Sequence, residues 1–191
     1  MTLKLWQRKP KLTYSKAVLD IVQFGSSLVE GSNPRDIDIA VIFNKIPLKD
    51  QLNQAQDIKK QLSKESEKPI HINSYDYYSL LDISNFAKDN ILLYGRSIIT
   101  GEYFVSRFGV TPRVQIHYSL KGMMKKDKIR FNYMLNGKQG EYGLLRKYGG
   151  RILNPGLIEV MPEYKELFLE SIRKLSAEYS TKLILELSTN T

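Results

Sequence analysis

Residues 18–43 read VLDIVQFGSSLVEGSNPRDIDIAVIF and consist of two apolar runs separated by small and polar residues. The first run is apolar and rich in β-branched residues, which predicts a short buried strand at residues 18–24. The residues that follow it are mainly Gly, Ser, Asn and Pro and predict a loop. The second run predicts a strand at residues 36–43, with Asp36 and Asp38 on one face and isoleucines on the other.

This order of elements suits phosphoryl transfer, which needs a positioned triphosphate and cations that neutralise charge on the leaving oxygens. A Gly-Ser turn after a strand brings backbone N–H groups and a hydroxyl close to phosphate, because glycine lets the backbone approach. Two carboxylates two residues apart on a strand point the same way, so they can share hard cations such as Mg²⁺. The alternative is a Gly/Ser turn before a strand whose acids are merely exposed.

The pattern of Gly25-Ser26, a spacer and Asp36-Ile37-Asp38 resembles the DNA polymerase beta nucleotidyltransferase superfamily, and it is most similar to minimal archaeal and bacterial nucleotidyltransferase domains. The resemblance covers residues 14–101, about half of the chain. It implies a nucleotidyltransferase-like mixed sheet flanked by helices and an NTP as substrate. It also implies that the nucleotide phosphates contact Gly25, Ser26 and Ser27, and that one or two Mg²⁺ (or Mn²⁺) ions are held by the catalytic pair Asp36 and Asp38.

Fully active members of this superfamily usually present a third acid from a later strand, which the resemblance places at residues 68–74. Alternation in that segment sends His71 and Asn73 to one face and isoleucines to the other. Asn73 could coordinate Mg²⁺ through its amide oxygen but is a poor base. His71 could act as a base, although a lone histidine is more often structural or exposed. Asp76 lies just past the expected strand and is an acid that could reach back.

The rest of the first half predicts alternating helices and strands. Pro47 and the helical spacing of the apolar residues after it predict an amphipathic helix to about residue 63. Residues 80–94 predict a mostly helical segment that ends at Gly95, and residues 97–104 predict a further strand.

The mixed order of elements continues in the second half, so we expect an α+β fold throughout. We place a nucleotidyltransferase-like domain at residues 1–107 and a small basic α+β domain at residues 108–191. Residues 114–120 and 128–135 predict strands, or a strand and a short helix. A helix is predicted to start at Pro162 and to carry one apolar face made of Tyr164, Phe168, Ile172, Leu175 and Tyr179.

The net charge of +9 is unevenly distributed. Residues 1–16 contribute +5 and residues 107–151 contribute +9, which leaves −5 for the rest of the chain. A basic segment beside an acidic one indicates a part that binds polyanions, and the alternative is a solvated lysine-rich surface. We expect RNA or a ribonucleoprotein as partner, and the candidate nucleic-acid-binding residues are Lys121, Lys125, Lys126, Lys128, Arg130, Arg146, Lys147 and Arg151.

Interleaved aromatic residues could stack on unpaired bases. We interpret two of them, Phe131 and Tyr133, as core residues of a strand instead.

Composition excludes several classes of protein. Hydrophobic residues make up 42% of the 191 residues, which is too many for a disordered chain. The absence of cysteine excludes disulfide partners, thiolate catalysis and zinc-finger sites. No apolar run approaches the roughly 18 residues that cross a bilayer, and no apolar h-region follows the basic start, so we expect a cytoplasmic protein without a membrane partner.

Three functions are consistent with these features. The first is a Mg²⁺-dependent nucleotidyltransferase that transfers a nucleotide to a hydroxyl of RNA, another nucleic acid or a protein. The second is a catalytically idle protein of the same fold that acts as an RNA- or ribosome-binding factor. The third is an antitoxin-type nucleotidyltransferase that modifies a toxin partner, which fits the strong positive charge less well.

Overall fold

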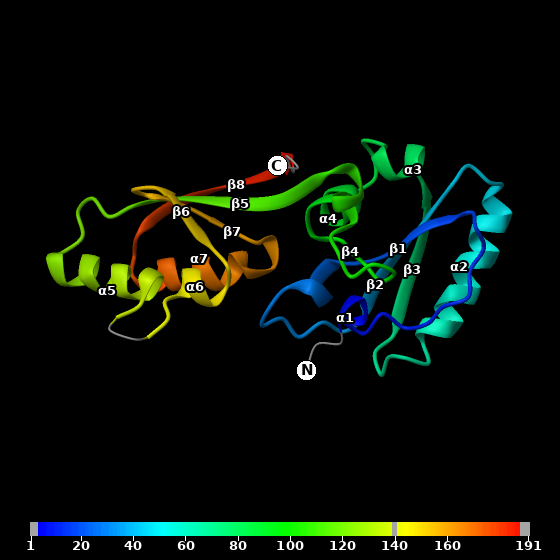
Figure 1. Cartoon of the computed structure of the whole chain (residues 1–191), viewed down its shortest axis with the longest axis horizontal. Helices are drawn as coiled ribbons and strands as arrows, with labels where there is room; N and C mark the ends of the chain where they lie inside the picture. The colour runs from blue at the N-terminus through cyan, green and yellow to red at the C-terminus, as the bar shows by residue number, and fades with distance from the viewer. Residues whose placement is uncertain (1–3, 139–140, 188–191) are drawn as a thin grey trace. The chain divides into compact units, whose positions relative to one another are not determined.

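The structure, a computed structural model, describes residues 4–138 and 141–187. The start of the first expected domain (residues 1–3) and the end of the second (residues 188–191) lie outside the described residues. It divides into two compact units, unit 1 up to Thr111 and unit 2 over Pro112–Leu187. Each unit contains one four-stranded sheet with helices (Figure 1), so the predicted α+β class is confirmed. None of the described helices is both long and apolar enough to span a membrane.

Unit 1 is built on a mixed sheet with the strand order β3-β2-β1-β4. Strand β1 (Val18–Phe24) pairs antiparallel with β2 (Ile37–Phe43) and with the two-residue β4 (Arg96–Ser97). Strand β2 pairs in parallel with β3 (Ile70–Asp76). A parallel pair needs a crossover connection, and α2 (Leu48–Leu62) supplies it.

The main core of unit 1 lies between α2 and one face of this sheet. The helix turns Ala55, Ile58 and Leu62 toward the sheet, at the spacing that places residues on one helical face. Each fully buried aliphatic side chain contributes about 1.5–3 kcal/mol. The sheet contributes its inward isoleucine and valine side chains together with Phe43, namely Ile21, Ile37, Ile39, Val41, Phe43 and Ile70.

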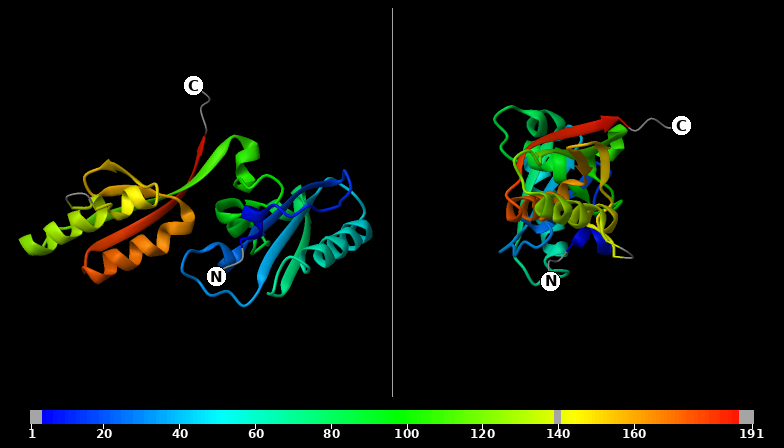
Figure 2. Two further views of the ribbon diagram at one scale, coloured as in Figure 1. Left: turned by 60° about the horizontal axis from the view of Figure 1, so that its bottom comes forward. Right: turned by 90° about the vertical axis from the view of Figure 1, so that its left-hand side faces the viewer.

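The other face of the sheet carries the even-numbered residues of β2 and those of β1 from Asp20 onward, and α4 (Lys88–Tyr94) lies over it, opposite α2 (Figures 1 and 2). Val22 and Ile91 are fully buried on this side. A side chain at Gly95, the residue after α4, would clash with Val22, so glycine is required where the helix meets the strand.

One predicted strand of unit 1 is wrong in its extent, and one predicted helix is interrupted. Of residues 97–104 only Ser97 belongs to a strand, the end of β4, because the chain turns back at Gly101 (φ +83°), whose N–H donates to the Ser97 carbonyl over 2.9 Å. A 3₁₀ helix, η2 (Phe104–Phe108), follows. The helix predicted at residues 80–94 is split into α3 (Tyr77–Leu81) and α4, and the Asp82 carboxylate between them accepts hydrogen bonds from Ser84.

Unit 2 has the strand order β6-β7-β5-β8. The longest strands are β5 (Val110–Ser119) and β8 (Glu178–Leu187). Strand β7 (Leu157–Val160) pairs antiparallel with β5 and with β6 (Arg151–Asn154), which lies at the edge. The sequence pattern places the boundary between the two parts after Arg107, and the structure places it four residues later.

Three helices lie on one side of this sheet (Figure 2, left view), and the two longer ones are α5 (Lys125–Asn136) and α7 (Lys165–Lys174). The third is the short α6 (Leu144–Lys147), and a 3₁₀ turn, η3 (Pro162–Tyr164), leads into α7. Their buried side chains form one core with the strands: Val114, Ile116, Phe131, Leu135, Leu145, Ile158, Val160, Phe168, Leu169 and Ile172.

The helical alternative for residues 128–135 is confirmed, because these residues lie within α5. Phe131 and Leu135 are buried one helical turn apart, whereas Tyr133 is 46% exposed. The core interpretation therefore holds for Phe131 but not for Tyr133, and neither lies on a strand. Tyr179 was expected on the helix after Pro162 but belongs to β8, because α7 ends at Lys174.

We expect Leu62→Ala to destabilise unit 1 by about 2–5 kcal/mol, because Leu62 is fully buried in α2 and its truncation leaves a cavity. The matched control is Leu52→Ala in the same helix, where the side chain is 50% exposed and the expected change is within about 0.5 kcal/mol. Urea unfolding can be followed by the fluorescence of Trp6, the chain's only tryptophan, which packs against this core. Equal losses in the two variants would contradict the described packing of α2.

Candidate metal and phosphate site

The strand register of unit 1 brings three separate segments to one place. Phe24, the last residue of β1, pairs with Asp38 on β2, so the bend after β1 lies beside the acid pair. On the other side of β2, Asp38 pairs with His71 on β3. These two pairings set the bend, Asp38 and His71 in a row across three strands.

Asp36, Asp38 and His71 each offer a ligand atom, and these atoms all lie within 4.8 Å of one another. The Nδ1 atom of His71 is 3.4 Å from a carboxylate oxygen of Asp36 and 3.9 Å from one of Asp38. The two aspartate side chains are about one-third exposed and the imidazole is 61% exposed, so the group is open to solvent. Two carboxylates suit Mg²⁺ or Mn²⁺ and an added imidazole is compatible with Mn²⁺, so this donor set fits a divalent cation.

The bend itself is the 3₁₀ helix η1 (Gly25–Leu28). Gly25 has φ +77°, which only glycine adopts readily, and a Cβ placed on it would lie 2.5 Å from an oxygen of Asp38. The backbone of the bend thus lies directly against the carboxylate of Asp38. Ser26 is exposed beside it, and its carbonyl accepts hydrogen bonds from Ser32 and Val29, which hold the loop closed.

Ser27 was predicted to bind nucleotide, but the structure does not bring its hydroxyl to the site. The side chain is fully buried. Its Oγ accepts a hydrogen bond from the Gln23 amide at 2.9 Å and donates to the Phe24 carbonyl at 3.3 Å. Ser27 therefore stabilises the bend through hydrogen bonds to β1.

Neither of the other two candidates on β3 supplies a third acid. Asn73 is exposed on the same face as His71 but pairs with Ala40, which lies two residues beyond Asp38 on β2. Asp76 pairs with Phe43, at the far end of β3 and on the opposite face. Its carboxylate caps α3 by accepting hydrogen bonds from Ser79, which hold the pKa of Asp76 below its usual value. The expectation that Asp76 could reach back is wrong.

The electrostatics of the acid pair favour a bound cation. Burial raises the pKa of Asp38 above its ordinary value of 3.8, the like charge of Asp36 raises it further, and His71 opposes the shift. The raised pKa means that this place disfavours the ionised form of Asp38, first because of burial and then because of the neighbouring charge. A cation would supply the missing positive charge.

Sequence reasoning did not single out Asp20, the other acid on this face of the sheet. It is 4% exposed, pairs with Ile42, and accepts hydrogen bonds from Ser97 Oγ at 2.6 Å and from the Ile21 N–H at 2.8 Å. A guanidinium nitrogen of Arg107 lies 3.6 Å from a carboxylate oxygen of Asp20. Burial raises the pKa of Asp20. The available signal was an acid inside an apolar strand, and its hydrogen bonds indicate that it fastens β4 to β1.

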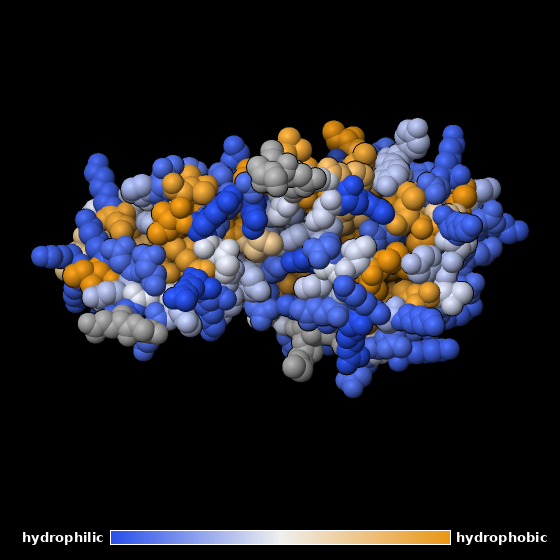
Figure 3. Space-filling model, in the orientation of Figure 1, coloured by the Kyte–Doolittle hydropathy of each residue, from blue (hydrophilic) through white to orange (hydrophobic). Residues whose placement is uncertain are grey.

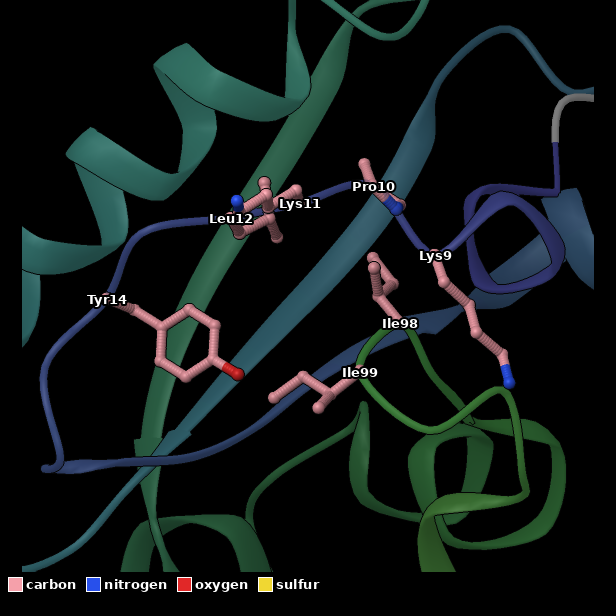
Figure 4. A pocket seen from close by; sticks show the side chains of 7 residues that line it. All are labelled: Lys9, Pro10, Lys11, Leu12, Tyr14, Ile98 and Ile99. Atoms are coloured by element: carbon pink, nitrogen blue, oxygen red, sulfur yellow. The ribbon is translucent and has the colours of Figure 1, made fainter.

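Unit 1 also contains a hollow of about 230 Å³ near its N-terminal segment. In Figure 4 the ring of Tyr14 points toward Ile99, whereas the amine of Lys9 points away from the other labelled side chains. No acid or histidine lines this hollow, so it lacks groups for metal binding or carboxylate chemistry; its lining residues are Lys9, Pro10, Lys11, Leu12, Tyr14, Ile98 and Ile99.

The basic residues predicted to bind nucleic acid all belong to unit 2. The structure places seven of them on or near α5 and α6: Lys121, Lys125, Lys126, Lys128, Arg130, Arg146 and Lys147. The eighth, Arg151, lies on β6 and forms ion pairs with Glu159 at 2.7 Å and Glu186 at 2.9 Å. Arg151 is therefore separated from the other seven by its location and its partners.

Comparisons of the chain with protein-family models, with curated proteins and with solved structures gave no match. The resemblance to nucleotidyltransferases remains a prediction, and the site is interpreted from its own residues.

We expect Asp36→Asn to lower the pKa of Asp38 in metal-free protein, because it removes a like charge that raises this pKa. Because the folded-state pKa of Asp38 lies above the unfolded value of 3.8, the free energy of unfolding falls as pH rises from 3.8 through the folded pKa. Asp36→Asn should narrow the pH range over which this fall occurs. The measurement is an NMR titration of the side-chain carboxyl carbons. Asp57→Asn, on the exposed side of α2, is the control and should leave the Asp38 titration unchanged. An Asp38 pKa that is the same with and without Asp36 would show that the two carboxylates do not face each other.

Proposed function

We propose that unit 1 is a divalent-cation-dependent nucleotidyltransferase, which transfers a nucleotide from an NTP to a hydroxyl of a nucleic acid or a protein. The observation that carries the proposal is the contact between the Gly25 bend and the carboxylate of Asp38. Phosphoryl transfer requires phosphate-binding backbone and cation-binding carboxylates within the width of one phosphate group. This contact provides that proximity.

Each residue has a role that follows from its place. The backbone of the bend and the exposed Ser26 hydroxyl would bind phosphate oxygens. Asp36 and Asp38 would hold Mg²⁺ or Mn²⁺, and His71 beside them would stay uncoordinated. When bound, the cation neutralises charge on the phosphate oxygens and on the leaving pyrophosphate.

The reaction itself needs a base as well as a cation site. The acceptor hydroxyl oxygen forms a bond to the α-phosphorus, the bond from that phosphorus to pyrophosphate breaks, and the hydroxyl proton must be taken up. His71 is the nitrogen base in this group, and its 61% exposure leaves it accessible to an acceptor. It stands on the strand where the resemblance implies a carboxylate.

One observation favours a second candidate function, a nucleotide-binding protein that does not catalyse transfer. Within residues 4–138 and 141–187, no third carboxylate joins Asp36 and Asp38 in the metal-binding group. An imidazole in place of a carboxylate brings one negative charge fewer to the cation. The two candidates share the binding site and differ only in whether the bound NTP reacts.

We expect Asp38→Asn to abolish both cation-dependent NTP binding and transfer, with a loss on the order of 100-fold or more in rate. Binding can be measured by calorimetry with Mn²⁺ and each NTP, and transfer by the movement of label from α-labelled NTPs to RNA or protein acceptors. Asp57→Asn is the matched control, because it makes the same change in unit 1 at a carboxylate paired only with Lys60.

These measurements separate the two candidates. Wild-type protein that binds Mn²⁺ and NTP but transfers no label would support the idle binding protein. If Asp38→Asn bound Mn²⁺ and NTP as the wild type does, both candidates would be wrong.

We expect Gly25→Ala to weaken Mn²⁺-dependent NTP binding at least tenfold, about 1.4 kcal/mol, because the new methyl group would displace the Asp38 carboxylate. Gly31→Ala is the control: Gly31 has a similar φ of +80°, so alanine there carries a similar backbone strain of about 1–2 kcal/mol, but its Cβ meets nothing within 4 Å. Calorimetry on both variants, with thermal unfolding to compare their stabilities, provides the measurement. Equal binding losses would mean that loop strain, and not contact with Asp38, controls the site.

A further inference from the structure

The positive charge of unit 2 is concentrated in one segment. Residues 121–150 contain eight lysines and arginines against two acids, a net charge of +6. The rest of unit 2 contains six bases and six acids, a net charge of zero. The whole excess of unit 2 thus belongs to the segment that forms α5 and α6.

The pattern of ion pairs also differs between residues 121–150 and the rest of unit 2. Most bases in the rest of unit 2 lie against acids: Arg113 and Arg151 against Glu159 and Glu186, Lys165 and Arg173 against Glu166, and Lys174 against Glu170. In residues 121–150 the one ion pair among described residues joins Arg130 to Asp127, at 3.6 Å. The other seven bases of this segment have no described carboxylate within 4.0 Å, so they are available to an external anion.

Two exposed tyrosines accompany these bases. Tyr133 on α5 is 46% exposed, and the amine of Lys138 lies 5.4 Å from its ring centre. Tyr142, just before α6, is 64% exposed, and the guanidinium of Arg146 lies 4.1 Å from its ring centre. A cation on one face of a ring leaves the other face open to a flat aromatic group such as a nucleobase.

A tight backbone crossing holds the two tyrosine–cation pairs at one junction. A side chain at Gly143 would overlap the backbone of Asn136 and Gly137, so the end of α5 touches the start of the α6 segment. The Gly137 N–H donates to the Tyr133 carbonyl over 2.8 Å, which places Tyr133 one turn before the crossing, and Tyr142 is the neighbour of Gly143. The two pairs therefore lie on either side of the same contact.

The charged side of α5 leads to this junction. Lys126, Arg130 and Tyr133 are spaced by four and three residues, which places them on one face of the helix. Figure 3 shows mainly hydrophilic residues, with a few apolar ones among them, at the left-hand end of the view over α5. We call the set of Lys126, Arg130, Tyr133, Lys138, Tyr142 and Arg146 the α5–α6 surface.

We propose that the α5–α6 surface binds single-stranded nucleic acid. The lysines and arginines neutralise backbone phosphates, and the two tyrosine rings stack on unpaired bases. A duplex keeps its bases stacked on each other and hides them from the rings, so single strands bind more tightly. This inference goes beyond the proposed function of unit 1 and does not depend on it.

The test is fluorescence anisotropy of the full chain with labelled oligouridylate RNA, oligothymidylate DNA and a duplex of equal length, each over a range of salt concentrations. The RNA and DNA arms show which sugar is preferred. The first variant, Tyr133→Leu with Tyr142→Leu, removes the rings and should weaken single-strand binding roughly tenfold or more. The second, Lys126→Gln with Arg146→Gln, should weaken binding and reduce the slope of log affinity against log salt by about 1.4.

The matched control is Lys165→Gln with Arg173→Gln on α7, which removes the same charge from the same unit at bases already paired with Glu166. Its affinity should stay within about twofold of the wild type. Asp38→Asn should bind single strands as the wild type does, so failure of the site in unit 1 leaves this proposal standing. Circular dichroism confirms that each variant is folded.

Several results would overturn the proposal. They are the absence of single-strand binding, duplex binding as tight as single-strand binding, and a control variant that loses as much affinity as the surface variants. Unchanged affinity in the tyrosine variant would also overturn it and would point to a purely electrostatic surface, of the kind that an acidic protein partner recognises.

Discussion

The pairing of β2 with β1 on one side and β3 on the other is the constraint on which unit 1 depends. Its register aligns Phe24, Asp38 and His71 across three strands and at the same time turns Ile37 and Ile39 into the core beneath α2. A shift of one residue would reverse every side chain of β2, burying the acids and exposing the isoleucines. Burial of the apolar face therefore fixes which side chains lie on the polar face.

The two neighbouring carboxylates of Asp36 and Asp38 repel each other, and this repulsion is unfavourable for the folded protein. Asp36 and Asp38 are like charges close together, partly removed from water, with His71 beside them. Asp20 on the same face differs, because Ser97, the Ile21 N–H and Arg107 surround it. An acid whose partners all come from the protein has a structural role, whereas a pair with few partners beside a glycine bend is a candidate for an external cation.

Unit 2 shows the same contrast with the opposite sign of charge. On α7 and on the strands, basic residues are matched by acids within the unit, and Arg151 is the clearest case. On α5 and α6 the described bases other than Arg130 lack such partners, and two exposed tyrosines accompany them. Charge that a protein leaves uncompensated on one surface attracts a partner of opposite charge, and this is the reasoning behind both proposed sites, one for a cation and one for a polyanion.

Patterns between neighbouring residues were enough to predict β1, β2, α2 and the acid pair, because strand alternation, helical spacing and turn chemistry are local properties. Local patterns failed to assign residues 128–135 because their apolar residues fit both a strand and a helix. Residues 129, 131, 133 and 135 alternate as in a strand, yet Phe131 and Leu135 are buried one helical turn apart. Local patterns also failed where a residue's role depends on a distant partner. His71 joins Asp38 from 33 residues away, Ser27 is held by Gln23, and Asp76 caps α3. Which polar groups meet, and which are already occupied, is decided by strand register and packing between segments that the chain order leaves far apart.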